Sequence, residues 1–393
     1  MVSVSLAQRA SAVHSGPIDD LFAALAHRPE VISFAVGAPD PGVFPPAATM
    51  APLVETAIGK YGPAVLQYGK TQGWPPMLDQ ARTLLCQRHI ECSSDRMHIS
   101  TGASGALHNV AMAMLDPGDV VLVETPTYEP AMKTFRSFGA TPVAVDCDEL
   151  GLLPDALDRI LARQRPAFVY ALPTFQNPTG RTMPASRRAE VAEVIVRRGA
   201  ILVEDDVYTD LRYDGVLVPA FWSFAPENTV YITSLSKTFA PAMRIGIVVM
   251  PPRLRDSVFV FKQSIDMQTS SFCQAIAAEF LASPAADAHL AEVVAVYARK
   301  LDKLACALSD CLPADFRWTR PEGGMFIWVE GPPTFDADAT LRRGLDAGVA
   351  FLPGRTFYTN PDAHRSTLRL SFAGVAEETI RPGIELLGAL CAQ

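Results

Sequence analysis

The chain has 393 residues, of which 49% are hydrophobic and 19% charged, enough apolar material to bury a large core or two subdomains that share an interface. The formal net charge is -8 and acidic and basic residues are interspersed, so a binding face for nucleic acid or anionic lipid is not expected. The seven cysteines form no CxxC pair, which favours reduced thiols over a metal site or a disulfide framework.

The N-terminal stretch MVSVSLAQRASAV lacks a basic start followed by an apolar run. No later stretch is apolar over the length that a bilayer requires. We therefore expect no membrane segment and a cytoplasmic location. Residues 1–44 predict one helix, which is followed by a stretch rich in proline and glycine.

Short β-branched runs alternate with amphipathic helical segments from about residue 97 to residue 250. The predicted strands are residues 119–124, 141–146, 167–172, 200–205, 229–234 and 244–250. The predicted helices between them include residues 103–115, 154–164 and 183–199, and the last of these ends on a glycine placed like a C-cap. This alternation is typical of a mostly parallel sheet that helices cover on both faces, with right-handed connections.

Residues 291–393 predict a different arrangement, a long helix followed by strands in FIWVE, VAFLPG and TLRLSF. We expect this part to pack with residues 1–44 as a smaller α/β domain, while residues 45–290 form the large domain. The sequence contains no internal repeat and no hydrophilic linker long enough to separate independent domains.

Four polar clusters directly follow predicted strands, and they read ETPTY, PTFQNPTG, EDDVY and SLSK. In open α/β sheets, ligands bind at the carboxyl ends of the strands. The four clusters are therefore expected to converge at one edge of the sheet.

Lys237 follows the predicted strand at 229–234, between Ser236 and a threonine, and Arg244 lies seven residues on. A lysine amine buried near other cations loses its proton more readily, as imine formation with an aldehyde requires. Arg244 and Ser234 could instead hold a phosphate. An isolated lysine at this position would more simply be a surface residue at the end of a strand.

Together these segments resemble the fold type I pyridoxal-phosphate-dependent enzymes, specifically class I/II aminotransferases of the aminoadipate and kynurenine aminotransferase kind. The resemblance covers nearly the whole chain and is carried by ISFAVGAPDPGVFP, LQYGKTQGWPPML, QNPTG, EDDVYTDLRY, SLSKTFAPAMRIG, EGGMFIWV, GVAFLPGRTFY and LRLSF. It implies an α/β fold in which the large domain holds a mostly parallel, seven-stranded sheet between helices. It also implies pyridoxal 5'-phosphate, bound to Lys237 as a Schiff base, and transfer of an amino group between an amino acid and a 2-oxo acid.

The resemblance assigns the cofactor ring to residues from the strand ends. Asp205 would pair with the pyridine nitrogen and keep it protonated, although Glu204 and Asp206 compete for this role and Asp205 could instead cap a helix. Asn177 and Tyr208 would hydrogen-bond the phenolic oxygen of the cofactor. The ring of Tyr128 would stack on the pyridine face; alone, it would be read as a core tyrosine.

The resemblance places the cofactor phosphate at the start of a helix, where free N–H groups and the helix dipole attract an anion. Gly102, Ala103 and Ser104 match these positions, with Ser234 and Arg244 as further phosphate ligands. Many relatives have Ser-Gln-Gln where this chain has Ala-Ser-Gly at 103–105, so the backbone contacts are expected and the glutamine contacts are not. Tyr68 resembles the tyrosine that reaches the phosphate of the neighbouring subunit, which implies a homodimer with shared sites.

The amino acid substrate would be bound through its α-carboxylate. Arg369 resembles the arginine that holds this group, supported by Gly37 and Asn177, although an arginine in a strand is often only a solvated residue. Lys237 would then move the proton from the α-carbon of the substrate as general base and acid. Lys237, Asp205 and Tyr208 are the predicted catalytic residues, and no metal is expected.

Three departures from the family pattern bear on the substrate. The N-terminal helix reads SGPIDD at residues 15–20, where relatives that act on acidic substrates carry an arginine. We hypothesise that an anionic Asp19 or Asp20 near the entrance favours a neutral or cationic side chain. Lys70 and the pair Pro241-Ala242 also differ from relatives, and these departures suggest a specialised enzyme of a biosynthetic pathway.

The same fold and cofactor also serve lyases and decarboxylating or deaminating enzymes, so the fold alone does not select transamination. A regulator with an aminotransferase-like domain would have a DNA-binding segment before it, and this chain shows no basic helix-turn-helix. A nucleotide-binding protein would require G-x-G-x-x-G after the first strand, which TGASGA does not supply.

Overall fold

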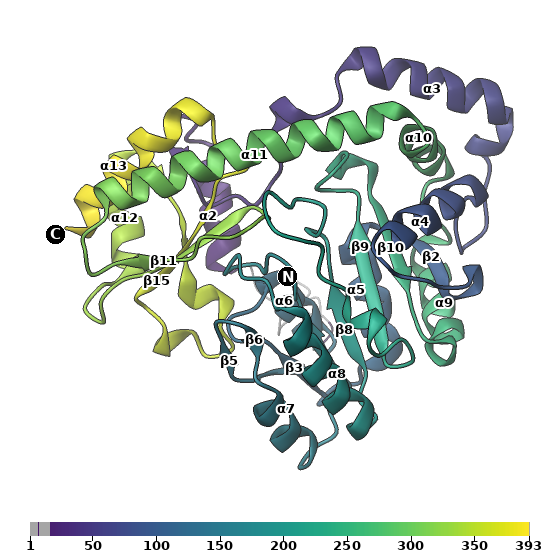
Figure 1. Cartoon of the computed structure of the whole chain (residues 1–393), viewed down its shortest axis with the longest axis horizontal. Coiled ribbons are helices and arrows are strands. Elements are labelled where there is room, and N and C mark those ends of the chain that lie inside the picture. Colours follow the sequence, from purple (N-terminus) through teal and green to yellow (C-terminus); the bar gives the residue numbers. More distant parts are fainter. Residues whose placement is uncertain (1–6, 8–15, 393) are drawn as a thin grey trace, which may run out of the picture.

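A computed structural model describes residue 7 and residues 16–392, so the N-terminal stretch discussed above lies, apart from Ala7, outside the described residues. The centre of the molecule is a seven-stranded sheet (Figure 1). In spatial order its strands are β2 (Met97–Thr101), β10 (Ile245–Val249), β9 (Thr229–Ser234), β8 (Leu202–Asp205), β7 (Phe168–Ala171), β3 (Val120–Val123) and β4 (Thr141–Ala144). All neighbours are parallel except that β10 runs antiparallel to both β2 and β9. The predicted α/β fold with a mostly parallel sheet is confirmed.

Helices cover both faces of this sheet, because its central strands are apolar on both sides. One face packs against α5 (Gly102–Met114), α6 (Glu129–Ser137) and α9 (Pro252–Asp266). The other face packs against α7 (Pro154–Leu161), α8 (Ala185–Arg198), α4 (Pro75–Gln87) and α10 (Ser271–Leu281). Successive strand residues alternate between the two faces, and this alternation decides below which polar side chains meet.

The predicted helix ending at Gly199 is α8, and Gly199 adopts the left-handed conformation, with φ 65°, that a glycine C-cap allows. The segment from 41 to 66 adds α3 (Ala47–Tyr61), which packs with α10. No helix in the described part of the chain has the length and apolar character needed to cross a membrane.

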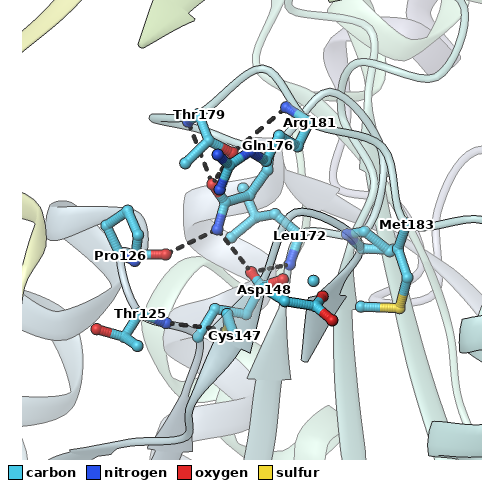
Figure 2. A pocket seen from close by; sticks show the side chains of 12 residues that line it. Thr125, Pro126, Cys147, Asp148, Leu172, Gln176, Thr179, Arg181 and Met183 are labelled. Atoms are coloured by element: carbon cyan, nitrogen blue, oxygen red, sulfur yellow. Dashed lines mark hydrogen bonds between the residues drawn. The ribbon is translucent and has the colours of Figure 1, made fainter. Parts of the chain in front are cut away.

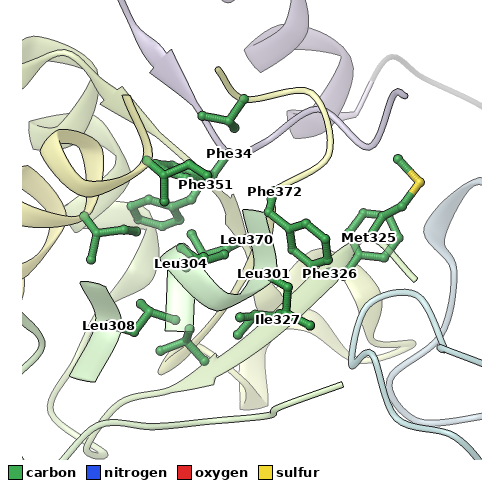
Figure 3. Packing of buried hydrophobic residues seen from close by; sticks show 14 of the residues in the cluster. Phe34, Leu301, Leu304, Leu308, Met325, Phe326, Ile327, Phe351, Leu370 and Phe372 are labelled. Carbon is green, nitrogen blue, oxygen red and sulfur yellow. The ribbon is translucent and has the colours of Figure 1, made fainter. Parts of the chain in front are cut away.

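A second lobe is built on a four-stranded antiparallel sheet with the order β11 (Arg317–Trp318), β12 (Phe326–Glu330), β15 (Thr367–Ser371) and β14 (Leu352–Pro353). Helices α11 (Pro284–Cys311), α12 (Ala337–Ala347) and α13 (Ile380–Cys391) surround it. Its core consists of aromatic and branched side chains that interdigitate (Figure 3): Phe34, Leu304, Leu308, Phe326, Ile327, Leu370 and Phe372.

The N-terminal segment joins this second lobe. Strand β1 (Ile32–Ser33) pairs in parallel with β13 (Val349–Ala350), and helix α2 (Pro17–Leu25) packs through Leu21 on Trp328 and Leu352. The helix α11 runs through residues 284–311 and connects the two lobes (Figure 1), so the domain boundary predicted at residue 290 falls inside it. The exact division into domains stays a prediction.

Candidate active site

A cavity of about 470 Å³ lies where the carboxyl ends of β8 and β9 face the second lobe. A cavity of this volume suits a small-molecule ligand. All of the site residues predicted from the sequence line it, apart from Gly102 and Tyr68: Gly37, Ala103, Ser104, Tyr128, Asn177, Asp205, Tyr208, Ser234, Lys237, Arg244 and Arg369. The expected convergence of the four polar clusters at one edge of the sheet is therefore observed in space.

Lys237 reaches into this cavity from the turn after β9. Its Nζ donates a hydrogen bond to the carbonyl of Gly37 at 3.2 Å. Burial lowers the pKa of Lys237 to about 8, and the positive charges of Arg369 and Arg244 act in the same direction, while Asp205 opposes them. The amine therefore has the lowered basicity that attack on a carbonyl carbon requires.

Asp205 ends β8 and offers one free oxygen to the cavity. Its Oδ2 accepts a hydrogen bond from the hydroxyl of Tyr170 at 2.7 Å, whereas its buried Oδ1 has no partner among the described residues. Burial raises the pKa of Asp205 to about 6, and the Tyr170 hydrogen bond counteracts this shift. A buried carboxylate oxygen without a partner is unfavourable unless a ligand donates to it.

The two competing carboxylates point elsewhere because β8 alternates between the faces of the sheet. Glu204 accepts hydrogen bonds from the backbone N–H groups of Phe221 and Trp222. Asp206 accepts a hydrogen bond at 2.8 Å from the hydroxyl of Tyr231, on the opposite face from Tyr170. Of the three adjacent acids, only Asp205 lines the cavity.

Asn177 is held by its neighbour Gln176, which lines a second, much smaller cavity of about 30 Å³ (Figure 2). The Gln176 amide donates to the carbonyl of Pro126 at 2.7 Å and to the buried carboxylate of Glu124 at 3.3 Å. These bonds fix the 176–180 turn against the end of β3. They thereby hold Asn177 at the main cavity, where its Oδ1 accepts from Arg369 at 2.9 Å.

Two tyrosine rings complete the walls around Lys237. Burial raises the pKa of Tyr208, and a hydrogen bond from Asn177 works in the opposite direction. Burial also raises the pKa of Tyr128 to about 12, with the charge of Asp205 as the next contribution. Both phenols are therefore neutral at ordinary pH and can donate hydrogen bonds into the cavity.

Arg244 and the start of α5 form the exposed end of the cavity. Arg244 has no ion-pair partner among the residues that the structure describes. A Cβ atom on Gly102, which has φ +71°, would lie 2.5 Å from Nη2 of Arg244, so only glycine lets the guanidinium approach here. The N–H of Gly102 donates to the carbonyl of Arg244, which leaves the N–H groups of Ala103 and Ser104 to bind an anion.

Ser234 supports this end rather than being free for a ligand. Its Oγ lies 2.9 Å from both the carbonyl of Ile245 and the hydroxyl of Ser236. Ser236, which the sequence interpretation did not include among the site residues, also lines the cavity. Both hydroxyls are therefore close to the exposed end.

Arg369 is a deeply buried cation on β15, only 4% exposed. Its Nη2 donates to the carbonyl of Ala35 at 2.6 Å, and the guanidinium lies 4.3 Å from the ring centre of Phe326. Burial lowers its pKa to about 10. Within residues 16–392 no carboxylate forms an ion pair with it, so the cavity presents a buried cation that favours an anionic ligand.

Several contributors were not foreseen from the sequence. Tyr170, the donor to Asp205, lies on the neighbouring strand and on the same face, but nothing in its sequence context distinguishes it from a core tyrosine. Ile18, Phe22 and Phe357 line the cavity because α2 and the second lobe fold over it. Tyr68 is 76% exposed and does not line the cavity of its own chain.

Asp19, which together with Asp20 we hypothesised to lie near the entrance as an anion, forms an ion pair with Lys133 of α6. The two side chains are 2.6 Å apart, and the same Asp19 oxygen accepts the N–H of Gly16 at 2.9 Å. These hydrogen bonds lower the pKa of Asp19. Neither Asp19 nor Asp20 lines the cavity.

Comparison with known proteins gives a consistent result. The family described as aminotransferase class I and II matches residues 29–387. Aromatic-amino-acid aminotransferase 1 of Thermococcus litoralis is 33% identical, over 91% of this chain and 87% of that protein, and 2-aminoadipate transaminase of Thermus thermophilus is 34% identical, over 93% and 91%. The crystal structure of Pyrococcus horikoshii kynurenine aminotransferase with PMP, at 32% identity, superposes with a TM-score of 0.93 over 98% of this chain and 96% of that one.

Proposed function

Because the chain belongs to the class I and II aminotransferases, we propose that the cavity around Lys237 is the active site of a pyridoxal-phosphate-dependent aminotransferase. The enzyme moves an amino group between an amino acid and a 2-oxo acid. The observation that carries the assignment is the meeting, in one cavity, of an amine of lowered pKa, a carboxylate with one free oxygen and a buried arginine without an anion.

The residues present fit the cofactor at each of its polar groups. Lys237 supplies the amine for its aldehyde, Asp205 Oδ1 a negative acceptor for its ring nitrogen, and Arg244 a cation for its phosphate. Asn177 and Tyr208 stand as donors for the phenolic oxygen. When bound, pyridoxal phosphate supplies an aldehyde that condenses with amines and a protonated ring that withdraws electrons from the α-carbon.

The phosphate end is supported by Arg244, by the start of α5 and by Ser234 and Ser236. The free N–H groups of Ala103 and Ser104 add the partial positive charge of a helix start. Gly102 contributes by allowing Arg244 to approach the helix, not by its own N–H group.

Arg369 orients the amino acid by binding its α-carboxylate. Two of its nitrogens already hydrogen-bond to Asn177 and Ala35, which fixes the plane of the guanidinium, while its buried Nε has no partner. A carboxylate pinned here keeps the α-carbon close to Lys237. The Nζ of Lys237, with a pKa of about 8, can then accept the proton from the α-carbon and return it.

We further infer a homodimer in which Tyr68 completes the site of the partner subunit. Leu66 ends a short 3-10 helix and Tyr68 follows it two residues later; both are 76% exposed, an arrangement that supports a role at an interface. Cytoplasmic location and a biosynthetic role stay predictions from the sequence. The relatives reported above are named for different amino acids, so family membership leaves the donor open.

The test loads the protein with pyridoxal phosphate and follows the absorbance of the bound cofactor as single amino acids are added. We expect conversion to the amino form of the cofactor, release of a 2-oxo acid, and reversal by a second 2-oxo acid. Lys237→Ala serves as the control and should not support this conversion. Release of ammonia or carbon dioxide without the amino form would show a lyase or a decarboxylating enzyme instead. Scattering measurements test the dimer.

A further inference from the structure

The cavity contains only a few charged side chains, and each has a place in the proposed function. Among the described residues, the charged groups that line it are Asp205, Lys237, Arg244 and Arg369. The first three face the polar groups of the cofactor and the fourth faces the α-carboxylate of the substrate. No charged group of the described chain is left to bind a charged substrate side chain.

The wall on the α2 side is largely apolar and comes from elements far apart in the sequence; the hydroxyl of Thr134, which is part of it, donates to the carbonyl of Pro130 at 2.9 Å. Helix α2 contributes Ile18 and Phe22, and α6 contributes Ala131. Leu352 and Phe357 of the second lobe face the same space and belong to one packed cluster with α2. This part of the cavity is therefore suited to an uncharged side chain, because a buried carboxylate or ammonium without a partner is strongly unfavourable.

The ion pair between Asp19 and Lys133 explains why these charges do not alter the apolar wall. The pair joins α2 to α6 outside the cavity lining, with the two side chains 37–47% exposed. It neutralises both charges at the surface. On the same helix, Ile18 and Phe22 line the cavity and Asp19 does not.

We propose that the amino donor of this enzyme carries an uncharged, apolar side chain of the size of leucine or phenylalanine, and that Ile18 and Phe22 of α2 select it. This inference rests on the proposed function, because it assumes that the four charged groups are occupied by cofactor and α-carboxylate. It differs from the hypothesis drawn from the sequence, in which an anionic Asp19 or Asp20 near the entrance favours neutral or cationic side chains.

The experiment mixes the holoenzyme with L-phenylalanine, L-leucine, L-2-aminoadipate, L-aspartate or L-lysine and measures the rate of the first half-reaction at several concentrations. We expect the two apolar donors to react at least about tenfold more efficiently than any charged donor. A charged donor that reacts as efficiently as phenylalanine would overturn the inference. A protein that converts none of these donors, or others tested, would instead contradict the proposed function.

Two variants locate the selectivity on α2. Phe22→Arg adds a cation to the cavity lining and should change the ratio of 2-aminoadipate to phenylalanine by at least about tenfold in favour of the acid. Ala24→Arg adds the same charge on the exposed side of the helix and should leave this ratio unchanged. If Phe22→Arg does not fold, Ile18→Lys makes the same test from the preceding turn. An unchanged ratio in a folded cavity variant would refute the assignment to α2.

A further variant tests whether the partner subunit binds the side chain of the substrate. Lys70 is exposed on the loop that carries Tyr68, and in a dimer this loop could supply a cation to the other site. If the wild type prefers an acidic donor and Lys70→Ala removes that preference, recognition is by the partner and the inference is wrong. If Lys70→Ala leaves the preference for apolar donors intact, the inference is supported.

Discussion

Removing the hydroxyl of Tyr170 tests how the ionisation of Asp205 is controlled. The Tyr170 hydroxyl donates to Oδ2 at 2.7 Å, both side chains are buried, and the pKa of Asp205 is raised to about 6 despite this bond. A hydrogen bond to a charged group contributes about 1.5–3 kcal/mol, which corresponds to roughly one to two pKa units at 1.36 kcal/mol each. In Tyr170→Phe the pKa of Asp205 should therefore rise to roughly 7–8 in the protein without cofactor.

The direction in which pH changes the binding of pyridoxal phosphate follows from the titration of the Asp205 carboxyl group. The ionised form of Asp205 is the one that accepts a hydrogen bond from the ring nitrogen, so binding of pyridoxal phosphate should strengthen as pH rises through the pKa of Asp205. The wild type should reach this strengthening near pH 6. Tyr170→Phe should reach it about one to two pH units higher and, at pH 7, bind roughly two- to tenfold more weakly because less Asp205 is ionised.

The assay is fluorescence titration of the cofactor-free protein with pyridoxal phosphate across this pH range. Tyr231→Phe is the matched control, since it deletes an equally buried hydroxyl that donates to Asp206 at 2.8 Å on the other face of the sheet. It should lower the stability of the fold by about 1–3 kcal/mol without moving the pH midpoint of cofactor binding. An unmoved midpoint in Tyr170→Phe, or an equal movement in the control, would refute the reasoning.

Three further predictions concern the other walls of the cavity. The rate at which cofactor-free protein captures pyridoxal phosphate should be about a hundredfold lower at pH 6 than at the high pH where the rate levels off, because only unprotonated Lys237, with a pKa of about 8, can attack the aldehyde. Stopped-flow absorbance measures this rate. Arg369→Met should raise the KM for amino acids by roughly 30-fold or more, as expected for losing a buried partner of a carboxylate, in steady-state assays; an unchanged KM would contradict the role. Gly102→Ala should weaken cofactor binding and lower Tm, because Gly102 has φ +71° and its Cβ would lie 2.5 Å from Arg244, whereas Gly105→Ala, with its nearest contact at 3.4 Å, should lower neither.

Most strands of the large lobe were predictable from the sequence, because they are short apolar runs of the kind that form buried strands. The predicted strands at 119–124, 141–146, 167–172, 200–205 and 229–234 each contain an observed strand, as does the one at 244–250. The antiparallel direction of β10 was not predictable, because a buried strand has the same composition in either direction. The chain order of strands and helices shows where polar clusters meet, but not how each strand is oriented.

The candidate site was predictable at the strand ends and less so beyond them. Lys237, Asp205 and Asn177 lie at or just after the carboxyl ends of strands in one sheet. Their convergence follows from the rule that the carboxyl ends of parallel strands meet at one edge of the sheet and form the ligand site. The distinction between Asp205 and its acidic neighbours depends on which face of β8 each one occupies. Alternation along β8 puts Asp205 on the same face of the sheet as Val203. The register, in which Tyr170 of β7 pairs with Val203, is what places the Tyr170 side chain on that face, in contact with Asp205. The position of Phe22 depends on packing between lobes, which no local pattern encodes.

The balance of charge in the cavity connects cofactor binding, substrate binding and side-chain selectivity. Three cations, Lys237, Arg244 and Arg369, line it with only one carboxylate, Asp205. Burial disfavours the charged forms of two of them, and it lowers the pKa values of Lys237 and Arg369. Anionic ligands relieve this imbalance, so a phosphate at Arg244 and a carboxylate at Arg369 should both stabilise the fold, and Tm should rise with pyridoxal phosphate. An additional anionic group on the substrate side chain would have no unpaired cation among the described residues that line the cavity. It would contact the apolar residues of α2 instead.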